Sequence, residues 1–278
     1  MDKATIIKLL NMDIADEHGA IIQYLVHAYA MGEGEMSCEI EAIAREEMRH
    51  LDWLAEKVVE LGGQPALGRG TMRMGGQSVS QWIDNNINLE EGAIKQYQEH
   101  MELIDAPDIK RLLKRILSDE RSHCGDFVHF VEKTKREDAE DVRGSHSDET
   151  IELLNWGIEH EYTVILQYLF QSYMTDDEEA SEQLQDQAIN EMQHLGWLAE
   201  KIVDRGGNPR VEHSMVDRST DKKHMLNVDI EIEKEVAAKY DQGANQTTDP
   251  GVKKLLERIR DHEIYHAEVF SDLLEEGK

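Results

Sequence analysis

The chain has 278 residues with a formal net charge of −28 at pH 7; four are proline and 6% are aromatic. So few prolines and aromatic residues disfavour a β-sandwich or barrel, and the acidic excess argues against nucleic acid, whose binding requires basic charge. No segment approaches the roughly 18 uninterrupted apolar residues of a membrane span. An acidic surface instead concentrates cations, although solubility or life in high salt would explain the charge equally well.

The N-terminal segment has only short apolar runs broken by lysine and aspartate, unlike a signal peptide. Cys38 and Cys124 form no CxxC pair and no disulfide framework. We therefore expect a cytoplasmic protein with two buried thiols that have no chemical role.

The two halves of the sequence are similar. The segment LLNMDIADEHGAIIQYL from Leu9 aligns with LLNWGIEHEYTVILQYL from Leu153. At the same offset of 144 residues, HLDWLAEKVVELGGQP from His50 aligns with HLGWLAEKIVDRGGNP from His194. This internal repeat indicates a tandem duplication.

The third aligned pair shows where the two copies differ in length. APDIKRLLKRILSDERSH from Ala106 aligns with DPGVKKLLERIRDHEIYH from Asp249 at an offset of 143 residues, so one residue is missing from a loop of the second copy. A charged stretch between the copies has no counterpart and reads as a linker. We expect domains at residues 1–136 and 149–278, joined by a linker at residues 137–148.

Each half is predicted to form four helices, because Leu, Ile, Ala, Glu, Gln and Lys dominate long segments. The Gly62-Gly63 pair is a helix stop and is repeated at Gly206. Pro107 and Pro250 stand where fourth helices would start, since a first-turn residue needs no N–H donor. In the first half the predicted helices lie near residues 3–31, 36–62, 79–105 and 107–135.

The connection between helices two and three is long enough to change the topology. Its stretch of about 15 residues reaches roughly 50 Å when extended, whereas a 27-residue helix is roughly 40 Å long. The connection can therefore run the full length of a bundle. The predicted fold class is all-α, with two tandem four-helix bundles and a long crossover between helices two and three of each.

Every predicted helix places a glutamate in the middle of its apolar stripe. Leu113, Ile116, Glu120, His123 and Phe127, for example, step by three and four residues, which is core spacing in a helical bundle. The alternative is that the apolar stripes are assigned to the wrong helix face and the glutamates face water. However, all eight helices of the two copies place a glutamate in the same position of the stripe. The eight are Glu17, Glu47, Glu90, Glu120, Glu161, Glu191, Glu233 and Glu263.

Histidines accompany half of these glutamates. Residues three apart on a helix project from one face, so each Glu-x-x-His pair aims at one point. Four carboxylates buried in one core without partners would be prohibitively unstable, and two divalent metal ions would balance their charge. The pairs are Glu47/His50, Glu120/His123, Glu191/His194 and Glu263/His266.

These motifs resemble the ferritin-like superfamily, and bacterioferritin most closely. In the first half the resemblance is carried by EHGAIIQYL, EEMRHLDWLAEKVVELGGQP, EEGAIKQY and DERSH. It implies two dinuclear centres in which the Glu-x-x-His glutamates bridge the metals and the lone glutamates are terminal ligands. Glu90 is preferred to Glu91 because Tyr97 follows it by seven residues, as Tyr240 follows Glu233. The implied ligands are Glu17, Glu47, His50, Glu90, Glu120 and His123 in centre one, and Glu161, Glu191, His194, Glu233, Glu263 and His266 in centre two.

Two further pairs of residues follow from the resemblance. Tyr24 and Tyr168 match a tyrosine beside the metal ligands, with either a redox role or only a hydrogen bond to a carboxylate. Met48 and Met192 match a haem-ligand position, although methionine is also a common filler between helices. If these methionines are haem ligands, haem is an additional cofactor; if they only fill space between helices, no haem is implied.

The sequence also departs from bacterioferritin. An inner-surface iron ligand is replaced by Ala42 and Asp186, each five residues before a bridging glutamate. The sequence continues for only 12 residues after His266, too few for the fifth helix of ferritin cages. We therefore expect a homo-oligomer other than a 24-subunit cage.

Oxygen and nitrogen donors around two close metals suit iron, with manganese as the alternative metal. The resemblance implies a ferroxidase that oxidises Fe(II) with O2 or H2O2, in iron homeostasis and protection against oxidative stress. A rubrerythrin-like peroxidase is the next reading, but the sequence lacks rubredoxin-type CxxC pairs and has Ala93 and Val236 where that family has a further glutamate. A manganese catalase and a non-catalytic iron storage or carrier protein are the remaining alternatives.

Overall fold

The computed structural model describes residues 1–32, 34–76, 78–134 and 148–276. Within these residues the secondary structure consists of eight α-helices without strands, which confirms the all-α prediction. Residues 137–147 of the predicted linker lie outside the described residues. The helices are α1 (Lys3–Met31), α2 (Glu35–Glu60), α3 (Val79–Leu103), α4 (Pro107–Thr134), α5 (Glu149–Met174), α6 (Glu178–Asp204), α7 (Lys222–Gln246) and α8 (Pro250–Glu276).

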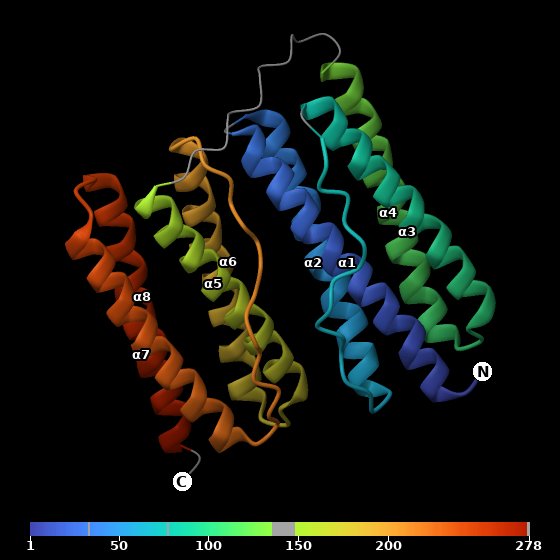
Figure 1. Ribbon diagram of the computed structural model, residues 1–278. Coiled ribbons are helices and arrows are strands. Elements are labelled where there is room, and N and C mark those ends of the chain that lie inside the picture. The colour runs from blue at the N-terminus through green and yellow to red at the C-terminus, as the bar shows by residue number, and fades with distance from the viewer. Residues whose placement is uncertain (33, 77, 135–147, 277–278) are drawn as a thin grey trace. The chain divides into compact units, whose positions relative to one another are not determined.

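The chain divides into two compact units, Met1–Arg143 and Gly144–Lys278, each containing one four-helix bundle. In the first unit α1 packs along α2 and α3 packs along α4, while α1 also contacts α3 and α2 also contacts α4. In the second unit the same pairing joins α5 to α6 and α7 to α8 (Figure 1). Each bundle is therefore built from two helical hairpins.

The connection between α2 and α3 runs along the bundle beside α1 (Figure 1). Side chains of α1 hold it: the backbone N–H of Ala66 donates to Oδ1 of Asn11 over 2.7 Å, and the N–H of Arg73 donates to Oε1 of Gln23 over 2.6 Å. Asn155 and Gln167 of α5 hold the connection between α6 and α7 in the same way. The predicted long crossover is confirmed in both bundles.

Glycine and proline residues mark the ends and starts of helices at the positions predicted from the sequence. Gly62 and Gly206 follow α2 and α6 with φ angles of 77° and 76°, the left-handed region in which glycine lacks a Cβ penalty. Pro107 and Pro250 are the first residues of α4 and α8. The shared end signals explain why the two bundles have the same layout.

The predicted apolar stripes form the cores, and the glutamates at their centres are buried. None of the eight is more than 4% exposed, so the alternative in which they face water is wrong. The expectation of two buried thiols is also wrong, because Cys38 is exposed and Cys124 is half-buried. Cys38 lies near the start of α2, where Ser37 and Ile40 face the core and the side chain of Cys38 faces solvent.

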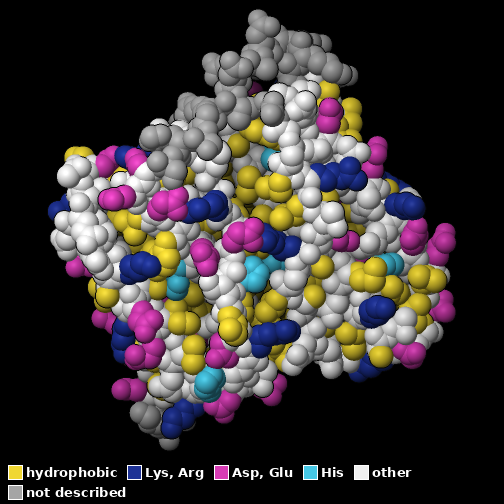
Figure 2. Space-filling model, viewed as in Figure 1, with side chains coloured by type: hydrophobic (Ala, Val, Ile, Leu, Met, Phe, Trp, Pro, Cys, Tyr) yellow, Lys and Arg dark blue, Asp and Glu magenta, His cyan; other side chains and the backbone are white. Residues whose placement is uncertain are grey.

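Acidic and basic side chains are intermixed on the face seen in Figure 2, with hydrophobic side chains between them. Among the helices that the structure describes, none combines the length and apolar character of a membrane-spanning segment.

Candidate dimetal sites

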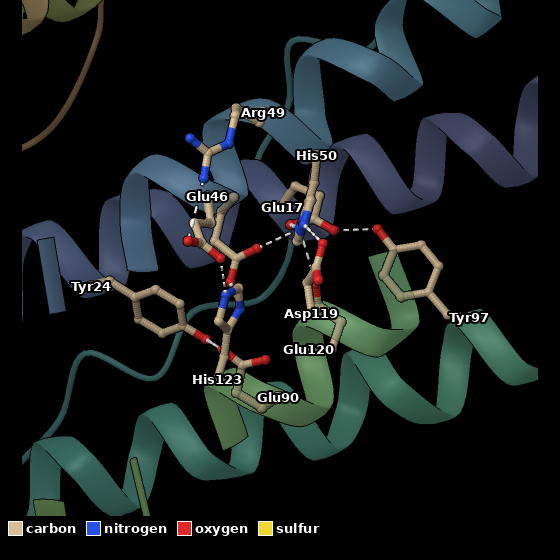
Figure 3. Close-up of polar contacts among 11 residues, drawn as sticks. Glu17, Tyr24, Glu46, Arg49, His50, Glu90, Tyr97, Asp119, Glu120 and His123 are labelled. Carbon is tan, nitrogen blue, oxygen red and sulfur yellow. Dashed lines mark hydrogen bonds and ion pairs between the residues drawn. The ribbon is translucent and has the colours of Figure 1, made fainter. Parts of the chain in front are cut away.

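The six residues predicted for the first centre converge between the four helices of the first bundle. Each helix contributes one glutamate, and α2 and α4 each add the histidine that follows one turn later (Figure 3). All are buried, with at most 4% of any residue exposed. The set consists of Glu17, Glu47, His50, Glu90, Glu120 and His123.

Glu47 lies between the two histidines. Its Oε2 is 2.8 Å from Nδ1 of His50, and its Oε1 is 3.0 Å from Nδ1 of His123. Oε1 of Glu120 lies 3.0 Å from the same nitrogen of His50. The bundle contains two groups of four ligand-type residues, and in each group one donor atom of every residue lies within 4.8 Å of the others. Glu47 and Glu120 belong to both groups.

The remaining two carboxylates lie at opposite ends of the cluster. Glu17 is 3.7 Å from Nδ1 of His50, and Glu90 is 3.9 Å from Nδ1 of His123. Each belongs to one group only, with the histidine it approaches. The arrangement thus provides two adjacent positions that share Glu47 and Glu120, and each position has one further glutamate and one histidine.

The second bundle repeats this arrangement with its own six residues. Glu191 approaches Nδ1 of His194 and of His266 at 2.7 Å each, and Glu263 approaches both at 3.2 Å. Glu161 joins the group of His194 and Glu233 joins the group of His266.

Several buried atoms that face each centre lack hydrogen-bond partners of acceptable geometry. In the first centre these include both carboxylate oxygens of Glu47 and Nδ1 of both histidines. In the second centre they include both oxygens of Glu191 and the corresponding nitrogens. Unpartnered buried polar atoms are costly, and a cation between them would satisfy all of them at once. The residues therefore fit a pair of metal ions.

The same crowding shifts the pKa values of the clustered groups. Burial and the charge of Glu47 raise the pKa of Glu17 to about 8. Burial opposes a charge on His123, but Glu47, Glu90 and Glu46 together outweigh burial and raise the pKa of the imidazole to about 9. Glu191 and Glu263 together raise the pKa of His266 to about 9 against the same opposition. Metal binding would have to displace these protons, so metal affinity should rise with pH.

Tyrosines link the lone glutamates across the bundle. Tyr24 on α1 donates to Oε1 of Glu90 on α3, and Tyr97 on α3 donates to Oε1 of Glu17 on α1 (Figure 3). In the second bundle Tyr168 donates to Glu233 and Tyr240 donates to Glu161. The sequence predicted a role for Tyr24 and Tyr168 but missed that of Tyr97 and Tyr240, although all four follow a lone glutamate by seven residues.

Sequence reasoning also missed the residue that precedes each Glu-x-x-His glutamate. Glu46 and Asp119 contact the outer ring nitrogens of the first centre's histidines, and His262 contacts that of His194. A polar residue at this position in all four motifs was the available signal. Met48 and Met192 are half-buried beside the shared glutamates, and their haem role stays a prediction.

Three comparisons place the chain among known proteins. The profile of the Ferritin family, the ferritin-like domain, matches residues 7–137 and 151–278. A bacterioferritin of Desulfovibrio desulfuricans is 32% identical over 127 residues, which cover 44% of this chain and 71% of that protein.

Solved structures also match about half of this chain. The X-ray structure of the D. desulfuricans bacterioferritin, which describes its diiron site in different catalytic states, matches with 29% identity and a TM-score of 0.47, covering 49% of this chain and 82% of that one. Rhodobacter capsulatus bacterioferritin, described with a metal-free dinuclear site and haem iron, matches with 25% identity and a TM-score of 0.45, covering 49% and 88%.

Proposed function

Since the chain belongs to the ferritin-like domain family, and within it to the bacterioferritins, we propose that each bundle holds a dinuclear iron centre that oxidises Fe(II). The observation that carries the proposal is the set of unpartnered carboxylate and imidazole atoms that face one another in the core of each bundle. Four glutamates balance the charge of two divalent ions. The donors are oxygen and nitrogen without thiolate, a set that suits iron and also manganese.

In this proposal Glu47 and Glu120 would be shared by two metal ions, with Glu17 and His50 holding one ion and Glu90 and His123 the other. Glu191 and Glu263 would be shared in the second centre. Fe(II) is the substrate: two ions held side by side would supply two electrons, either to O2, which with two protons gives H2O2, or to H2O2, which with two protons gives two molecules of water.

The chain's own residues position the ions and handle the charge. Tyr24 and Tyr97 hold the terminal glutamates by hydrogen bonds, so these carboxylates are oriented before a metal arrives. The apolar core around them excludes bulk water, which strengthens the attraction between carboxylate and cation. Protons displaced from His123 and Glu17 when metal binds are available to the reduced oxidant.

The physiological role we propose is iron homeostasis and protection against oxidative stress in the cytoplasm, in a homo-oligomer of this chain. A ferroxidase is favoured over a rubrerythrin-like peroxidase because the position that would carry a further glutamate is Ala93 in the first bundle and the buried Val236 in the second.

The test is anaerobic loading with Fe(II), followed by addition of O2 and separately of H2O2. We expect uptake of four ions per chain, one for each group of ligand-type residues, and rapid oxidation. Binding without turnover would make the protein a carrier. Fast peroxide consumption with little iron oxidised would make it a peroxidase.

A further inference from the structure

In the first bundle the residue that precedes each Glu-x-x-His glutamate lies on the outer side of a histidine on the neighbouring helix. In the first bundle Nε2 of His50 faces Oδ2 of Asp119 at 3.4 Å, and Nε2 of His123 faces Oε2 of Glu46 at 3.0 Å (Figure 3). Both histidines turn Nδ1 toward the centre, so Nε2 is free to donate its hydrogen outward. Each candidate histidine ligand in this bundle therefore has a carboxylate on its outer side.

The second bundle has no carboxylate at either position. The residue aligned with Asp119 is His262, whose Nδ1 lies 2.9 Å from Nε2 of His194. The residue aligned with Glu46 is Asn190, which donates to Oε1 of Gln187 over 3.2 Å. An amide is neutral and an imidazole carries no negative charge in either protonation state, so both carboxylates are missing beside the second centre. Arg49, which pairs with Glu46 over 3.3 Å, is aligned with the neutral Gln193 and offsets one of these charges.

A third substitution removes a carboxylate next to a candidate ligand. Asp16, beside Glu17 on α1, is aligned with the half-buried His160 on α5. Gln96, which donates to Asp16 over 2.7 Å, is aligned with Lys239. Glu159, aligned with Ala15, restores one negative charge on α5, so these three positions together are one charge less negative in the second bundle.

Histidine ligands whose second nitrogen donates to a carboxylate are more basic and better oriented, and loss of such partners typically lowers metal affinity 10- to 100-fold. Nearby negative charge also attracts a divalent cation directly. Asp119 and Glu46 have side chains that are 37% and 45% exposed, so water screens part of this attraction. The exchange of charged hydrogen-bond acceptors for an imidazole and an amide therefore contributes most of the difference.

We propose that the two centres are unequal: the first binds divalent metal more tightly than the second, and Asp119 and Glu46 are the positioning residues responsible. The inference rests on the dinuclear centres of the proposed function, but it concerns their relative affinity and not the oxidation of iron. Tandem duplication has then separated a high-affinity centre from one that fills only at higher metal concentration.

The test uses Co(II), which binds such sites without being oxidised and reports its coordination by visible absorption. Glu191→Ala leaves the first centre to be titrated alone, and Glu47→Ala leaves the second. We expect Co(II) to bind roughly 10- to 100-fold more tightly in Glu191→Ala than in Glu47→Ala.

Exchange of the aligned residues Glu46 and Asn190, and of Asp119 and His262, between the two bundles provides the matched control. Adding Asn190→Glu and His262→Asp to Glu47→Ala should tighten Co(II) binding toward that of the first centre. Adding Glu46→Asn and Asp119→His to Glu191→Ala should weaken it. In the same background Asp119→Glu should retain affinity and Asp119→Asn should lose it, a difference that a merely structural role would not produce when circular dichroism shows both variants folded.

Equal affinities in the two single variants, or affinities that the exchange leaves unchanged, would overturn the inference while Fe(II) oxidation stands. Absence of Co(II) uptake by the folded unsubstituted chain would overturn the inference and the proposed dinuclear centres together.

Discussion

Tyr24 and Glu90 are joined by a hydrogen bond of 2.5 Å between α1 and α3, with both side chains buried. Tyr97 and Glu17 make the reciprocal bond from α3 to α1. Each lone glutamate is therefore held by a tyrosine of the opposite helix, so one pair of contacts orients two candidate ligands and ties the two helical hairpins together.

Replacement of Tyr24 by phenylalanine should destabilise the metal-free protein. Oε2 of Glu90 already lacks a partner, and the variant would leave both oxygens of a buried carboxyl unsatisfied. We expect a loss of about 1–3 kcal/mol in the free energy of unfolding, measured by chemical denaturation. Tyr265→Phe is the control, since Tyr265 is 58% exposed and should change stability by about 0.5 kcal/mol or less. Equal effects in the two variants would show that this bond does not hold Glu90.

Removal of one bridging carboxylate should disable one centre and spare the other. Glu47→Ala and Glu191→Ala are each expected to retain roughly half of the Fe(II) oxidation rate at saturating Fe(II), because the centres lie in separate bundles and distant effects add. Metal analysis should show the four-ion stoichiometry halved in each variant. The double variant should be inactive. Complete loss in either single variant would mean that the centres are coupled.

Asp229 should make the stability of the second bundle depend on pH. Its Oδ1 accepts hydrogen bonds from Gln167 and Gln171, but its Oδ2 lacks a partner, and burial raises its pKa from 3.8 to about 7. Between these values the unfolded carboxyl is ionised while the folded one is protonated. The folded state therefore loses stability as pH rises from about 4 to about 7, and the loss is constant above that.

Asp229→Asn should accordingly be more stable than the unsubstituted chain at pH 8, and the difference should vanish near pH 4. Asn86 occupies the aligned position of the first bundle, where its Oδ1 accepts from Gln23 and His27. The reverse substitution, Asn86→Asp, should lower stability at pH 8 and have little effect near pH 4. Thermal unfolding across this pH range measures both, and a pH-independent difference would contradict the assignment.

Gly70 lets the crossover pass against α1. Its N–H donates to the carbonyl of Ala15 over 2.5 Å, and a Cβ at this position would lie 2.9 Å from Cα of Asp16. Gly70→Ala should therefore destabilise the first bundle by about 1–3 kcal/mol, since backbone atoms would have to move. Gly68→Ala is the matched control, because a Cβ there meets no atom within 4 Å. Similar unfolding midpoints for both variants would show that the crossover can shift freely.

Features carried by residues close together in the sequence could be predicted. The fourth helix was expected at 107–135 and spans Pro107–Thr134, because proline favours the first turn and the apolar stripe continues to the end. The pairing of Glu47 with His50 follows in the same way, since residues three apart share a helix face. The repeat supplied the same pattern a second time and made the buried glutamates recognisable.

Contacts between helices could not be predicted in this way. His50 and Asp119 are separated by 69 residues, and Tyr24 and Glu90 by 66. Whether such side chains meet depends on the axial register and rotation of one helix against another, which packing of the whole core decides. Tyr97, Tyr240 and the residues that contact the outer histidine nitrogens were therefore missed, and the glutamate that accepts from Tyr24 could not be named.

The amino-acid pattern alone was sufficient to establish eight helices, two bundles and twelve candidate ligands, because helix periodicity and end signals act over three or four residues. Tertiary packing decided which tyrosine donates to which glutamate. It also placed carboxylates against the outer nitrogens of the histidines in one centre but not in the other. These contacts arise only when four separate helices are brought to one register, so their geometry is a property of the folded bundle.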